Sequence, residues 1–252
     1  MRTIIFKGKH IEVPGIPEEL TPGQYREYVR LAMLLTGGHI DLRKWRTAWY
    51  SILAGLEHYS YEVLHDRYRR EAESQLAEVT DPYLVDHGSG PVPRFDSCRN
   101  LLPEYGGYKG PADWLNDVRF DRFVECATII EAHHEDDGDY AEVARVLYSI
   151  PPEDDVPMIL AWHAPMLFLA VWKAIQSGPI EINGRDVDFS IIFRSSGPRR
   201  PDDKTGWAGI TFEIATSGVF GNVAEVEASP FWSVLMYLYK CKFEYIHDKS
   251  KK

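Results

Sequence analysis

The chain has 252 residues, 44% of them hydrophobic and 13% aromatic, and its 28 basic and 38 acidic side chains give a formal net charge of −10. So much aromatic surface argues against disorder over the whole length, because those side chains would have to stay exposed to water. The acidic balance argues against DNA or RNA as the main partner, since a nucleic-acid interface needs a basic footprint.

The chain begins with a predicted β-hairpin and a predicted helix. Residues 3–13 hold short apolar runs on either side of a turn at 7–9, which is typical of two strands joined tightly. Thr21 and Gln24 then have the spacing of a capping box, with a proline between them at the first helical position. The glycine pair 37–38 is expected to end this helix.

The clearest amphipathic helix follows, with Asp41 as its expected N-cap. Its apolar residues recur at helical spacing and form one stripe, which predicts a face packed against other elements. The stripe consists of Leu42, Trp45, Trp49, Ile52, Leu53 and Leu56. A third helix is expected to begin at Ser60 and to run to about Glu78.

Between residues 87 and 111 the composition changes, because glycine and proline recur too often for a regular element. This segment is predicted to be a long loop or an insertion, and loops of such length tend to be functional or disordered. Its aromatic and leucine side chains, such as Phe95, Leu101 and Tyr105, favour a segment that docks on the protein.

Helical spacing returns at 120–130, and after an acidic break at 133–139 a short helix is expected to end before Pro151. Residues 157–175 are apolar over a length that could cross a bilayer. His163, Pro165 and Lys173 interrupt that run, so a buried core helix kinked at Pro165 is favoured over a membrane span.

A second hairpin is predicted around Asn183-Gly184, a strong two-residue turn signal flanked by alternating apolar residues. Residues 194–204 have the composition of a flexible linker. The expected fold is mainly α, an irregular helical bundle with one or two short β-hairpins. It would form a single mostly helical domain over 1–252, with a loop insertion at 87–111 and the linker at 194–204.

The C-terminal region predicts three more helices. The first begins near Thr205 and ends at Gly218, which suits the left-handed position after a helix. Asn222 has a glutamate three residues later, which is a second capping signature. Ser229, followed by proline, is expected to cap a long aromatic helix from Phe231 to His247.

Signals for catalysis or metal binding are weak. The cluster at 133–139 lacks the spacing of a zinc site, and a solvated acidic loop is favoured. His58, Glu62 and His65 would share a helix face only if the helix began before its expected cap at Ser60. No nucleophile elbow, phosphate-binding loop or dinucleotide-binding motif is present. The sequence therefore predicts a protein that is not an enzyme and needs no cofactor or metal.

Cysteine use and the N-terminus favour a reducing cytoplasm as the setting of this chain. The cysteines, Cys98, Cys126 and Cys241, are odd in number and far apart, which favours neither a disulfide framework nor a metal site. The first residues contain only a three-residue apolar run before charge returns, so a signal peptide is not expected.

Several helices have apolar stripes wide enough to bind a partner helix. Ordinary core positions are the alternative, and for these side chains the core is favoured. The candidates for partner binding are Trp45, Trp49, Phe231, Trp232 and Leu235.

The C-terminal region resembles that of tail assembly chaperone-like proteins of tailed bacteriophages and prophages. The residues that carry the resemblance are Gly206-Trp207, Glu213, the turn at 217–221, Glu225, Glu227 and the apolar run 234–238. Residues 119–151, the apolar segment 156–174 and the start of the chain are also similar, whereas 87–111 and 194–204 have no match. The resemblance carries over no catalytic residues.

What the resemblance implies is a chaperone that binds apolar helical segments of the tape-measure protein in the host cytoplasm during tail morphogenesis. The tail tube protein and a second copy of the chain are further possible partners, and neither nucleic acid nor a membrane is expected. Two alternatives stay open, a structural virion protein of the tail or neck and an enzyme of unrecognised type.

Overall fold

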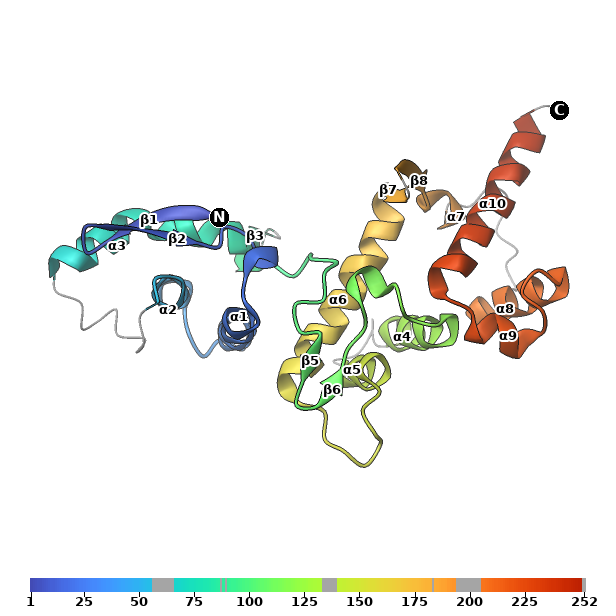
Figure 1. Cartoon of the computed structure of the whole chain (residues 1–252), viewed down its shortest axis with the longest axis horizontal. Helices are drawn as coiled ribbons and strands as arrows, with labels where there is room; N and C mark the ends of the chain where they lie inside the picture. The colour runs from blue at the N-terminus through green and yellow to red at the C-terminus, as the bar shows by residue number, and fades with distance from the viewer. Residues whose placement is uncertain are drawn as a thin grey trace. The chain divides into compact units, whose positions relative to one another are not determined.

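The computed structural model describes residues 1–55, 66–86, 88, 90–132, 140–182, 184–193 and 205–250 (Figure 1). The chain is mainly helical and its strands form short two-stranded antiparallel sheets, which confirms the predicted fold class. It divides into two compact units, Met1–Ser97 and Cys98–Lys252. The sequence predicted one domain with a loop insertion at 87–111, and the boundary between the two units falls inside that segment.

The first unit combines short hairpins with α-helices. Its elements are β1 Arg2–Phe6, β2 Lys9–Val13, η1 Pro17–Glu19, α1 Pro22–Thr36, α2 Leu42–Leu53, α3 Asp66–Thr80, η3 Asp81–Tyr83, β3 Leu84–Asp86 and β4 Pro91–Pro93. As predicted, β1 and β2 pair antiparallel, with Phe6 opposite Lys9. Lys7 and Gly8 adopt φ of 53° and 71°, the left-handed conformation that a two-residue hairpin turn requires.

The caps predicted in this unit are also present. The Thr21 hydroxyl accepts a hydrogen bond from the Gln24 backbone N–H at 3.2 Å, and the Gln24 side chain accepts one from the Thr21 N–H at 3.0 Å. The Asp41 carboxylate accepts a hydrogen bond from the Lys44 N–H at 2.7 Å, so it caps α2. Other predicted features lie outside the described residues: Leu56, the helix start at Ser60, the acidic break at 133–139, Asn183 and the linker 194–204.

An aromatic cluster forms the core of the first unit. The Tyr28 ring centroid lies 5.2 Å from that of Trp49 and 5.3 Å from that of Phe95. The Tyr28 hydroxyl donates a hydrogen bond to the Tyr83 carbonyl at 2.9 Å, and the Tyr83 hydroxyl donates one to the Pro14 carbonyl at 2.7 Å. These two hydroxyls are satisfied, so the two tyrosine rings are buried without unpaired donors, whereas the buried indole N–H of Trp49 has no hydrogen-bond partner in the described part of the chain.

The second unit is built mostly from helices. Its elements are β5 Glu104–Tyr105, β6 Tyr108–Lys109, η4 Asp113–Leu115, α4 Phe120–Ala132, α5 Ala141–Tyr148, α6 Met158–Ser177, β7 Pro179–Ile182, β8 Arg185–Asp188, α7 Ser190–Phe193, α8 Gly206–Ser217, α9 Val223–Ala228 and α10 Phe231–Ser250. Helix α5 packs against both α4 and α6. In the core, the Phe123 ring stacks on Phe231 with centroids 3.9 Å apart and contacts Phe168 at 5.2 Å.

Helix α6 is the apolar segment that the sequence placed in a core. By length and composition it could cross a membrane, and half of its most apolar stretch is buried inside the protein. Leu160, Phe168 and Ile175 are among its buried side chains, and the helix continues through Pro165. It therefore contributes to the core of the second unit.

The segment around Asn100 docks through a buried polar cluster. The Asn100 side-chain N–H donates a hydrogen bond to the Pro111 carbonyl at 2.7 Å, and its Oδ1 accepts one from the Leu102 N–H at 2.9 Å. His163 Nε2 lies 2.9 Å from the same Oδ1, and the Tyr148 hydroxyl donates to the Leu102 carbonyl at 2.7 Å. Because Oδ1 can only accept, Nε2 is the protonated nitrogen of a neutral His163. These bonds join the predicted loop to α5 and α6.

Two of the three C-terminal caps are as predicted. Gly218 has φ of 72° at the end of α8, and Asn222 forms a capping box with Glu225 at the start of α9. The prediction that Ser229 caps α10 is wrong, because its hydroxyl donates instead to the Glu225 carbonyl at 2.8 Å. Helix α10 begins at an antiparallel bridge, Arg119 opposite Pro230, which ties it to the start of α4.

Replacing Asn222 with alanine is expected to lower the free energy of unfolding by about 1 kcal/mol, because the first turn of α9 loses its side-chain acceptor. Asn222→Ser keeps an acceptor and is expected to retain most of that stability. Urea unfolding followed by circular dichroism would compare the two. Equal midpoints for Asn222→Ala and the native chain would show that the cap contributes nothing.

Candidate functional site

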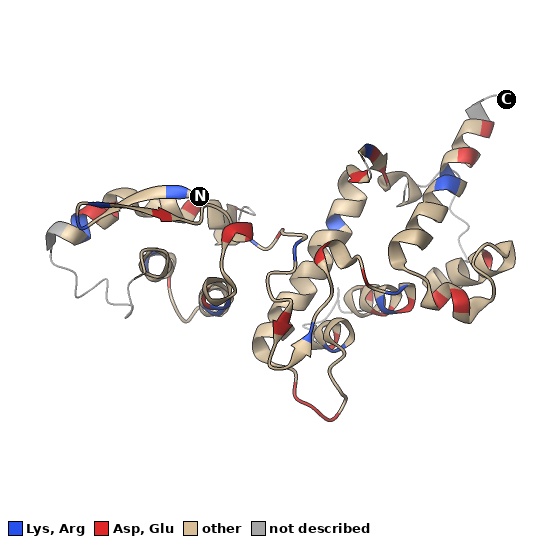
Figure 2. Cartoon of the chain, in the orientation of Figure 1, with Lys and Arg blue, Asp and Glu red and all other residues tan. Residues whose placement is uncertain are grey.

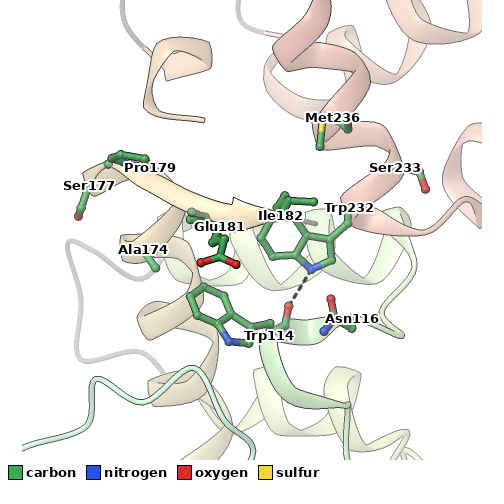
Figure 3. Close-up of a pocket in the computed structure, with 12 residues that line it drawn as sticks. Trp114, Asn116, Ala174, Ser177, Pro179, Glu181, Ile182, Trp232, Ser233 and Met236 are labelled. Atoms are coloured by element: carbon green, nitrogen blue, oxygen red, sulfur yellow. Dashed lines mark hydrogen bonds between the residues drawn. The ribbon is translucent and has the colours of Figure 1, made fainter. Parts of the chain in front are cut away.

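A groove of about 1150 Å³ opens in the second unit among η4, the end of α6, β7 and α10. Most of its surface is apolar, and Figure 3 shows two tryptophan side chains at its centre. The residues that line it are Trp114, Asn116, Ala174, the run 177–182, Trp232, Ser233 and Met236.

Trp114 reaches the groove from an unusual backbone conformation. Its φ and ψ are 59° and 19°, and the next residue, Leu115, has φ of 55°. Two successive non-glycine residues in the left-handed region cost on the order of 1–3 kcal/mol each. The burial of Leu115 and a 2.7 Å hydrogen bond from the Trp114 N–H to the Cys98 carbonyl hold the turn in place. Strain of this kind clusters at binding sites, where it positions a side chain.

Trp232 is oriented by the same turn. Its indole N–H donates a hydrogen bond to the Trp114 carbonyl at 2.8 Å, drawn as a dashed line in Figure 3. The Trp232 ring also contacts Phe189, with centroids 5.7 Å apart. Its polar end is therefore satisfied inside the protein, and the rest of the ring lines the groove. A site whose aromatic side chains are already held in place loses little conformational entropy on binding.

Glu181 supplies the charge of this site. Among the described residues that line the groove, it is the one ionisable side chain. It is exposed, and within the described chain its carboxylate has no hydrogen-bond or ion-pair partner. The groove thus combines two aromatic rings, an apolar lining and one negative charge.

The structure places only one of the five predicted partner-binding residues in this groove. Trp45 and Trp49 have no exposed surface in the core of the first unit. Phe231 is 1% exposed and Leu235 is 2% exposed in the second unit, and Leu235 also lies at the floor of another groove of about 760 Å³. Trp232 is partly exposed and lines the larger groove. Four of the five side chains thus serve the protein's own packing.

Sequence reasoning missed Trp114 and Glu181. No local signal marks a left-handed backbone at Trp114, because bulky residues normally avoid that region. Glu181 lies in the predicted hairpin, and its alternation with Ile180 and Ile182 could have shown that it occupies the polar face. That it faces two tryptophans from other elements follows only from the tertiary fold.

No candidate metal site is found within the described ranges. They contain no group of three or more histidine, cysteine or acidic side chains that could hold a metal ion. The clusters at 133–139 and at His58, Glu62 and His65 lie outside those ranges. Burial raises the pKa of the Cys126 thiol well above its usual range, so this cysteine stays protonated at neutral pH.

Comparisons with known proteins leave the groove as the main structural guide to function. No protein family, curated protein or solved structure matches the chain. The groove is suited to binding through shape and apolar contact, since its only ionisable group among the described lining residues is a solvated carboxylate.

Proposed function

We propose that the chain is a non-enzymatic, tail assembly chaperone-like protein that binds apolar helical segments of a phage tape-measure protein during tail morphogenesis. The observation that carries the proposal is the groove with its preorganised tryptophans, Trp114 and Trp232. The resemblance of the C-terminal region to such chaperones names the partner.

The chemistry of the groove suits a helical client. A tape-measure chain exposes long apolar stripes before the tail tube surrounds it, and exposed stripes of this kind aggregate. Helix-in-groove binding buries a few apolar side chains of one helix face in an apolar cleft. Trp114, Trp232 and Met236 provide such a cleft.

The charge of the chain supports the same role. The net charge of −10 would keep a complex with an apolar client dispersed. Figure 2, which colours the ribbon by residue type, shows acidic positions on several elements of each unit rather than gathered in a single element. The groove itself holds one carboxylate in an apolar lining, so apolar contact can dominate there.

Replacing Trp232 with alanine is expected to weaken binding to the tape-measure protein at least tenfold, because buried tryptophans are the commonest binding hot spots. The measurement is co-purification of the two coexpressed proteins, followed by calorimetry on the purified pair. Phe212→Ala is the matched control, since Phe212 is 61% exposed on α8 and does not line the groove. Circular dichroism would verify that both variants fold.

Two results would contradict the proposed function. One is failure of the native chain to bind a phage tape-measure protein. The other is the chain's presence at stoichiometric amounts in purified phage particles, which would favour a structural tail or neck protein.

A further inference from the structure

The β7–β8 hairpin brings a second carboxylate, that of Asp186, beside Glu181, although Asp186 itself does not line the groove. In the antiparallel register, Glu181 lies directly opposite Asp186, so both side chains extend from the same face. Directly opposed residues have Cβ atoms about 5 Å apart, and like charges at that spacing destabilise the pair. Neither carboxylate has an ion-pair or hydrogen-bond partner in the described part of the chain. A cation supplied from outside would relieve this repulsion.

The tryptophan rings add a second attraction for a cation. Figure 3 shows the Glu181 carboxylate over the part of the groove that holds the Trp114 ring, with the Trp232 indole on the α10 side. A cation over the face of a tryptophan is attracted by the ring quadrupole, and the attraction grows when the site is partly desolvated. The apolar stem of a long basic side chain would pack on the remaining lining, including Met236.

We propose that this groove selects partner helices that carry an arginine or lysine within their apolar face. Its ligand is a basic side chain whose charged end lies at Glu181 and Asp186 and whose stem passes between Trp114 and Trp232. Arginine is preferred, because its planar guanidinium both stacks on aromatic rings and pairs with carboxylates in a fork. The inference rests on the proposed function only for the identity of the partner.

Charge complementarity decides between the possible occupants of the groove. No basic side chain lines it among the described residues, so an acidic or purely apolar segment would leave the carboxylates uncompensated. A second copy of this chain is disfavoured by the net charge of −10 that both copies would bear. A partner helix with one basic residue among apolar ones would contact the apolar lining and would also pair with the Glu181 carboxylate.

Synthetic helical peptides would test this directly. The probe is an amphipathic peptide with apolar residues at helical spacing and an arginine at the centre of the apolar face, compared with versions bearing glutamine or glutamate there. Calorimetry at low salt is expected to show the arginine peptide binding about tenfold more tightly than the glutamine peptide, and the glutamate peptide more weakly still. Glu181→Gln is expected to remove most of the preference for arginine.

The control variant is Glu213→Gln, which makes the same change of charge on α8 outside the groove and should keep the full preference for arginine. Equal affinities for the arginine and glutamine peptides would overturn the inference, as would an undiminished preference in Glu181→Gln or failure of all three peptides to bind. If Glu181→Gln still co-purifies fully with the tape-measure protein, the inference fails while the proposed function stands. If the native chain discriminates the peptides but binds no tape-measure protein, only the proposed function fails.

Discussion

Replacing Phe231 with aspartate is expected to unfold the second unit rather than to weaken partner binding alone. Phe231 is 1% exposed, and its ring stacks on Phe123 with centroids 3.9 Å apart. Truncating a buried phenylalanine to alanine costs about 3–5 kcal/mol, because apolar contacts are lost and a cavity remains. An aspartate adds the desolvation of a charge with no cation to pair it. The sum is comparable to the whole stability of a typical domain.

Phe243 provides the matched control on the same helix, because it is 44% exposed. Phe243→Asp makes the same chemical change where water can solvate the carboxylate, and it is expected to cost about 1 kcal/mol or less. Thermal unfolding followed by near-ultraviolet circular dichroism would separate the two variants. A Phe231→Asp protein that melts like the native chain would show that this side chain does not serve the core.

Features set by a few neighbouring residues were predictable from the sequence. The capping boxes at Thr21 and Asn222 and the turn at Lys7 depend on side chains within three or four positions of one another. Such local signals form caps and turns independently of the tertiary fold. The prediction of a cap at Ser229 was wrong because the start of α10 is not set locally. A strand-like bridge from a distant segment determines how that helix begins.

The candidate site depends on contacts between distant segments, so most of it was not predictable. Phe231 and Trp232 are adjacent, yet one lies in the core and the other lines the groove, because successive helix positions point about 100° apart. An apolar stripe does not show which of its members faces the protein's own core. The orientation of Trp232 further depends on the carbonyl of Trp114, 118 residues away in the chain.

The division into two units was also not predictable from the sequence. Phe95 packs on Tyr28 in the first unit, whereas Leu101 and Leu102 are buried in the second. Composition marks 87–111 as one irregular segment rich in glycine and proline. The apolar side chains at its two ends resemble each other, and nothing local shows that they belong to different cores.

The buried cluster around His163 makes the stability of the second unit depend on pH. Burial lowers the pKa of His163 from 6.5 to about 3, because the imidazolium would lose its hydration. Well above pH 6.5 the histidine is neutral in both the folded and the unfolded chain, so His163 does not contribute to the pH dependence of stability there. As the pH falls from 6.5 towards 3, the unfolded chain binds a proton that the folded chain does not. The folded state is therefore destabilised with falling pH over this window.

The expected size of this effect is on the order of 2 to 3 kcal/mol on going from pH 7 to pH 4.5. His163→Gln is the appropriate comparison, since a glutamine amide can still donate a hydrogen bond to Asn100 Oδ1 but does not titrate. Urea unfolding at several pH values would give the difference in free energy of unfolding between the two proteins. The contribution of the carboxylates, which both proteins share, cancels in that difference. A difference that stays constant between pH 7 and pH 4.5 would mean that His163 is protonated in the folded protein, and the cluster would then have to accommodate a charge beside Asn100.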